Sequence, residues 1–155
     1  MNLPHSQQLE DGYCLAACVQ MVMAAQGIQR DQTELARLLG TRPGMGAAFP
    51  NVLRLDSRVW WITCREGTEA DLLQALSENA LPVLAVNTSQ LPYWQSPSQH
   101  VIVLADMEAG ATQNLHERMA VVHDPAFPEP LHVSMGDVLL AWDEMQNFYA
   151  LIQRK

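Results

Sequence analysis

The stretch QQLEDGYCLAACVQMVMAAQG, residues 7–27, decides how this chain can fold. Residues 14–26 are apolar on nearly every side, and they are followed by Gly27; glycine commonly ends helices. The segment therefore predicts a buried helix. Cys14 is the first residue of that helix, where the positive end of the helix dipole favours a thiolate. Gln8, shortly upstream, offers an amide N–H₂ group. The N-terminal segment therefore carries a candidate nucleophile and a candidate oxyanion donor.

Length and composition indicate one globular domain over residues 1–155. The chain is 48% apolar, which is ample for a single core. Its net charge of −8 argues against a nucleic-acid partner, because a phosphate backbone favours a basic surface. No signal peptide and no membrane-spanning apolar run is visible. Three cysteines do not make a disulfide framework, so we expect a reducing, cytoplasmic location.

Periodicity and turn residues predict an α+β domain. After the first helix, capping signals predict helices at 31–40, 68–79 and 134–142. Runs of β-branched and aromatic residues predict strands at 58–64, 82–86, 100–106, 119–124 and 148–153. Residues 41–56 hold glycines and prolines without a clear period and are expected to form a loop. We expect N-terminal helices packed on a mainly antiparallel sheet.

A cysteine nucleophile needs a base, and the base needs an orienting group. The chain offers five histidines, at positions 5, 100, 116, 123 and 132. His100 begins an apolar strand directly after a polar loop, and Asp124 ends the next strand. If the two strands are antiparallel, Asp124 approaches His100 and can fix its tautomer, with Pro125 restraining the chain. His123 is the strongest competitor, but strand alternation points it away from the face of Asp124.

These residues, in this order, resemble the family C39 peptidases, papain-like bacterial cysteine peptidases best known as leader-cutting domains of bacteriocin exporters. The matching positions are Gln8, Cys14, Cys18, Met21, Gly27, Pro82-Val83, His100-Val101-Ile102-Val103 and Asp124-Pro125. The resemblance implies a papain-like fold with Cys14 as nucleophile, His100 as base, Asp124 as orienting residue and Gln8 as oxyanion donor. It also implies hydrolysis of a peptide bond in a peptide or protein tail, with cleavage after small residues such as Gly-Gly as one option, and no cofactor.

Three aromatic residues are expected to bind substrate. Tyr13 stands where the family carries an aspartate, and Leu15 where it carries a glycine, so Tyr13 is expected to alter substrate choice. Tyr93 and Trp94, in the loop before His100, are candidates to wall the cleft. The loop over residues 41–56 is expected to border the substrate subsites.

Other interpretations remain open. The same Cys-His-Asp set could transfer an acyl group to an amine or thiol, or the domain could hold a peptide without cutting it. Taken alone, Cys14 could be a small core residue. Cys18 and Cys64 are interpreted as structural. A metal site is not predicted, because Cys14 and Cys18 lack a third and fourth ligand. No oligomeric state is predicted.

Overall fold

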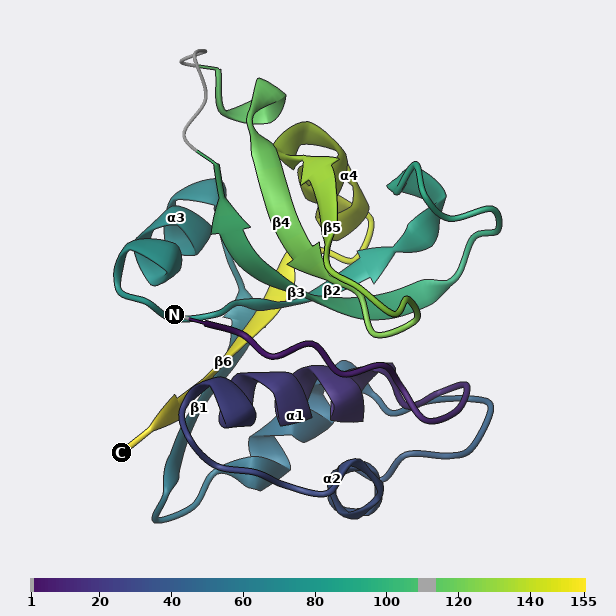
Figure 1. Cartoon of the computed structure of the whole chain (residues 1–155), viewed down its shortest axis with the longest axis vertical. Coiled ribbons are helices and arrows are strands. Elements are labelled where there is room, and N and C mark those ends of the chain that lie inside the picture. Colours follow the sequence, from purple (N-terminus) through teal and green to yellow (C-terminus); the bar gives the residue numbers. More distant parts are fainter. Residues whose placement is uncertain (1, 109–113) are drawn as a thin grey trace.

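A computed structural model describes residues 2–108 and 114–155 (Figure 1). Its α-helices are α1 (Cys14–Ala25), α2 (Gln32–Leu38), α3 (Glu69–Ser77) and α4 (Met135–Asp143). Its strands are β1 (Trp60–Glu66), β2 (Val83–Asn87), β3 (Gln99–Met107), β4 (Met119–His123), β5 (Leu131–Ser134) and β6 (Phe148–Arg154). Three 3₁₀ turns, η1 (Phe49–Leu55), η2 (Thr88–Gln90) and η3 (Leu115–Glu117), complete the described elements.

The six described strands form one antiparallel sheet in the order β1-β6-β2-β3-β4-β5. In Figure 1, α1 and α2 lie in one half of the molecule, and β2–β5, α3 and α4 lie in the other. The long strands β1 and β6 extend along both halves. The sequence prediction of helices packed on a mainly antiparallel sheet is confirmed.

Strand β3 separates two apolar cores because its side chains alternate between the two faces of the sheet. Val101 and Val103 pack with α1, whereas Ile102 and Leu104 pack with α4. This burial on both faces explains why residues 101–105 read as a continuous apolar run. It also holds α1 against β3.

Two elements differ from the sequence prediction. Residues 41–56 are not all loop, because Phe49–Leu55 form η1 and bury Val52 and Leu55. The four-residue strand β5 was not predicted. It has only one fully buried side chain, Val133, so its sequence carries no clear alternation. It extends the sheet by pairing with β4.

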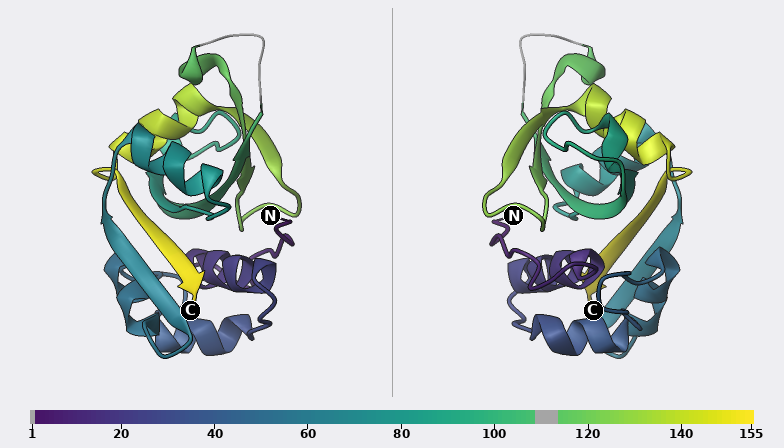
Figure 2. Two further views of the ribbon diagram at one scale, coloured as in Figure 1. Left: turned by 90° about the vertical axis from the view of Figure 1, so that its left-hand side faces the viewer. Right: turned by 90° about the vertical axis from the view of Figure 1, so that its right-hand side faces the viewer.

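The N-terminal segment before α1 forms neither helix nor strand, yet it is held firmly. It runs between α1 and the β4–β5 connection (Figure 2). Leu3 is buried in the core beside α1, and the backbone N–H of Gln8 donates to the carbonyl of Pro125 over 2.7 Å. The segment therefore joins the helical half to the sheet half. None of the helices in the described residues is long and apolar enough to cross a membrane.

Candidate active site

The first turn of α1 presents Cys14 at an open helix end. Tyr13 occupies the N-cap position without a side-chain cap, and the first turn contains no acidic residue. The first N–H groups of a helix have no partner inside the helix, so the N–H of Cys14 can donate to a ligand. The remainder of α1 is almost wholly buried. Burial of the helix thus fixes a half-buried thiol at its positive end.

His100 and Asp124 form a buried pair, as the sequence predicts for antiparallel strands. Register pairing of Val103 with His123 carries Asp124 toward the beginning of β3. The Nε2 atom of His100 lies 2.6 Å from Oδ1 of Asp124. Asp124 is fully buried and His100 is 7% exposed. With Nε2 engaged, Nδ1 is the ring nitrogen left to face Cys14.

Asp124 accepts three further hydrogen bonds, from the Tyr93 hydroxyl, the Trp94 indole N–H and the backbone N–H of Ala126, each 2.9 Å long. Burial alone would raise the pKa of Asp124, but the hydrogen bonds from His100, Trp94 and Ala126 hold that pKa below its usual value. The carboxylate therefore stays charged. Tyr93 is not on the cleft wall, where the sequence analysis placed it. Its hydroxyl supports Asp124 instead.

The surroundings of His100 favour its protonated ring. Burial disfavours the charged ring and is the largest single influence, but Asp124 and Cys14 together outweigh it through hydrogen bonds and charge. The pKa of His100 consequently rises from 6.5 to about 9. An imidazolium beside Cys14 stabilises a thiolate, so the arrangement suits a Cys–His ion pair.

Gln8 lies in the same cleft as Cys14 and His100. Its side-chain Oε1 is buried and has no hydrogen-bond partner among the described residues. The amide nitrogen is then the group of Gln8 that can donate into the cleft. Together with the N–H of Cys14, it provides two donors suited to an oxyanion.

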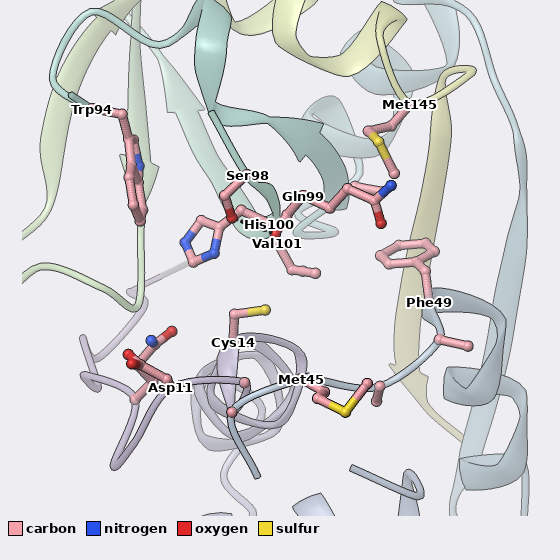
Figure 3. Close-up of a pocket in the computed structure, with 17 residues that line it drawn as sticks. Asp11, Cys14, Met45, Phe49, Trp94, Ser98, Gln99, His100, Val101 and Met145 are labelled. Atoms are coloured by element: carbon pink, nitrogen blue, oxygen red, sulfur yellow. Dashed lines mark hydrogen bonds between the residues drawn. The ribbon is translucent and has the colours of Figure 1, made fainter. Parts of the chain in front are cut away.

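These residues line a cleft of about 410 Å³. In Figure 3 Cys14 lies below His100, and its sulfur is directed along the cleft beneath Val101. Trp94 lies beyond the His100 ring, and Phe49 and Met145 lie on the opposite side of the cleft. The Trp94 and His100 rings meet edge to face, with their centroids 4.9 Å apart. Trp94 is therefore both a cleft residue and a shield for the His–Asp pair.

The other wall comes from the loop over residues 41–56, as expected from the sequence. Its contribution is Gly44, Met45, Gly46, Ala47, Ala48 and Phe49. Gly12 has φ +91°, and a Cβ atom there would lie 2.8 Å from the nitrogen of Gly46. Glycine at position 12 thus allows the loop before Cys14 to pack directly against this wall.

The remaining sequence candidates lie away from the cleft. The side chain of Tyr13 lines a separate hollow against α2 and is not among the residues that line the cleft. Cys18 is fully buried one turn deeper in α1, and burial raises the pKa of its thiol well above the usual value. Cys64 is half-buried beside the α1 core. His123 contacts His5 rather than Asp124, in agreement with strand alternation.

Sequence reasoning missed several cleft residues, including Met145, Ser98 and Gln99. Ser98 and Gln99 adjoin His100 and could have been inferred from that position. Met145 gave no signal, because it follows α4 and reaches the cleft only through the fold. Among the described residues, no group of three or more His, Cys, Asp or Glu side chains is placed to hold a metal ion.

Comparison with known proteins identifies the fold and the family of the chain. The crystal structure of a candidate C39-like peptidase from Bacillus anthracis superposes with a TM-score of 0.70 at 16% sequence identity. The match covers 99% of this chain and 96% of that one, so the two share a fold. No curated protein matched the sequence. Residues 1–150 match the sequence profile of the Peptidase_C39 like family, and the chain therefore belongs to that family.

Proposed function

We propose that this protein is a cysteine peptidase that hydrolyses a peptide bond, with Cys14 as nucleophile, His100 as acid and base, Asp124 as orienting residue and Gln8 as oxyanion donor. The observation that carries the proposal is the buried His100–Asp124 pair beside a thiol at an uncapped helix end. A binding module would have no need of a charged carboxylate satisfied by four donors beneath a histidine.

The reaction begins with attack of the Cys14 thiolate on the carbonyl carbon of the substrate. A C–S bond forms, and the negative oxygen accepts hydrogen bonds from the Cys14 N–H and the Gln8 amide; such a donor contributes about 3 kcal/mol. Protonated His100 gives its proton to the leaving amine as the C–N bond breaks. His100 then accepts a proton from water, which attacks the thioester and releases the carboxylic acid with Cys14 restored.

The cleft shape supports an extended peptide as substrate. Beyond Phe49 and Met145 the cleft continues into a second hollow, which also includes Pro50 and Phe148. The wall formed by residues 44–48 consists of glycine and alanine residues together with Met45. An extended chain can lie along this path with small groups beside the thiol and an apolar side chain further out.

Thiol labelling tests the nucleophile. Iodoacetamide at neutral pH is expected to alkylate Cys14 fastest, because only this thiol combines exposure with an adjacent imidazolium. Peptide mapping by mass spectrometry identifies the labelled cysteine. The Cys14→Ala variant should lose the fast phase, whereas Cys18→Ala should keep it. Fast labelling that persists without Cys14 and disappears without Cys18 would overturn the assignment.

A peptide-library cleavage profile then tests the reaction itself. We expect cleavage products from the unmodified protein and none from Cys14→Ala or from protein alkylated at Cys14. Intact peptide recovered in stoichiometric complex, without an acyl adduct, would instead identify a binding module.

A further inference from the structure

Gln32, the first residue of α2, is a buried polar side chain that the proposed mechanism does not use. It is only 3% exposed, although glutamine is mostly an exposed residue. Its Oε1 accepts a hydrogen bond from the backbone N–H of Leu9 over 2.8 Å. Its Nε2 donates to the carbonyl of Gln7 over 3.2 Å and to Oε1 of Gln20 over 3.0 Å.

The two backbone groups that Gln32 binds lie on either side of Gln8. The N–H of Gln8 itself donates to the carbonyl of Pro125. Residues 7–9 belong to no helix or strand, so no regular hydrogen-bond ladder fixes them. The backbone around Gln8 is therefore held by Gln32 from the helical half and by Pro125 from the sheet half.

We infer that Gln32 is a positioning residue, which clamps the backbone of residues 7–9 so that the Gln8 amide meets the oxyanion. The inference rests on the proposed function, in which Gln8 is the oxyanion donor. Such a donor is effective only when it is already aimed at the place where charge develops. A donor on an irregular segment would otherwise lose this alignment through motion of its backbone.

Glutamine suits the clamp because one planar amide supplies both an acceptor for Leu9 and a donor for Gln7. The molecule contains a second clamp of the same kind at the other end of α1. Gln26 donates to the carbonyl of Ile152 over 2.7 Å and accepts from the N–H of Arg154 over 2.9 Å. Gln26 lies outside the cleft, so it provides a matched control.

Two small reagents separate positioning of the oxyanion donor from reactivity of the thiol. Acylation of Cys14 by p-nitrophenyl acetate passes through a tetrahedral oxyanion and releases p-nitrophenolate. Alkylation of Cys14 by iodoacetamide displaces iodide and forms no oxyanion. The second-order rate of each reaction is measured for the parent protein, Gln32→Met, Gln26→Met, Gln8→Ala and the double variant Gln8→Ala/Gln32→Met.

We expect Gln32→Met to lower the acylation rate about tenfold, less than removal of the Gln8 amide itself lowers it. The alkylation rate should stay within about twofold of the parent, since it does not use the oxyanion donors. In the Gln8→Ala background, Gln32→Met should have almost no further effect on acylation, because the two residues act as a unit. Gln26→Met should lower the melting temperature without a selective loss of acylation.

An equal loss of acylation in both backgrounds, or a parallel loss in Gln26→Met, would overturn the inference and leave Gln32 a structural residue. If Gln32→Met does not fold, Gln32→Glu replaces it; this variant keeps the acceptor for Leu9 and loses the donor to Gln7. Unchanged acylation in a folded Gln32→Glu would likewise overturn the inference. Failure of the parent protein to react at Cys14 would overturn the proposed function instead.

Discussion

Two buried histidines on neighbouring strands have pKa values that are shifted in opposite directions. His100 is the second residue of β3 and is 7% exposed. His123 is the last residue of β4 and is 5% exposed. The pKa of His100 is raised to about 9, whereas that of His123 is lowered to about 4. Burial disfavours the charged ring in both cases. The partners therefore decide the outcome: a carboxylate and a thiol for His100, a second histidine for His123.

The His123 contact has a structural role of its own. Its Nδ1 lies 3.0 Å from Nδ1 of His5, and Nε2 of His5 donates to the carbonyl of Phe127 over 2.7 Å. Two cationic rings at this distance would repel, which adds to the effect of burial on His123. One strand end thus presents a charged carboxylate to His100 on one side and a neutral imidazole to the N-terminal segment on the other.

The largest expected effect is a difference in Cys14 acylation rate between variants of the two histidines. His100→Gln should lower the rate of Cys14 acylation by p-nitrophenyl acetate by roughly 10²–10⁴-fold, because the proton acceptor and the imidazolium are both lost. His123→Gln should leave the rate nearly unchanged, since Gln8 is held independently by Gln32 and Pro125. Comparable losses in the two folded variants would show that the His5–His123 contact, and not His100 alone, controls the chemistry.

A second prediction concerns the pH dependence of stability. The folded pKa of His100 lies above 6.5, so its stabilising contribution is complete below pH 6.5 and is lost as the pH rises through about 9. The folded pKa of His123 lies below 6.5, so stability falls as the pH drops from 6.5 toward 4, where only the unfolded chain takes up this proton. From these two groups, the free energy of unfolding should be highest near pH 6.5.

The free energy of unfolding should fall by about 3 kcal/mol on the acid side of this maximum and by the same amount on the alkaline side. Urea unfolding between pH 4.5 and 9.5 measures it. His100→Gln should remove the loss of stability at alkaline pH, and His123→Gln should remove the loss of stability at acid pH. If His100→Gln still loses stability as the pH rises toward 9, the raised pKa does not belong to this residue.

The smallest effect concerns the support of Asp124. Tyr93→Phe removes one of two donors to Oδ2 and leaves Trp94 in place. The loss should lower the free energy of unfolding by about 1 kcal/mol and the melting temperature by a few degrees. Acylation should fall much less than in His100→Gln. Trp94→Phe is the matched variant, because it removes the other donor to the same oxygen and also the edge-to-face contact with His100.

Much of the candidate site could be predicted from the sequence. Cys14, His100 and Asp124 stand at a helix start, a strand start and a strand end, and Gln8 lies shortly before the cysteine. The resemblance to the C39 peptidases singled out these four residues. The structure brings all four together, and their catalytic roles remain predictions. Tyr93 was misplaced because a loop sequence does not show which way a side chain turns. Gln32 was missed because, in sequence, it is an ordinary polar residue at the beginning of a short helix.

Most elements and the order of the chemical groups follow from the sequence, because apolar periodicity and capping residues act over only a few positions; η1 and β5 do not. Among the predicted elements are the buried helix behind Cys14 and the apolar strand behind His100. Which partner each polar group contacts depends on the tertiary structure. Antiparallel register set Asp124 beneath His100 and turned His123 toward His5, and packing of α2 carried Gln32 under the segment of Gln8. Those contacts join residues distant in the chain. They determine that His100 rather than His123 is charged, and that Gln32 holds the backbone around Gln8.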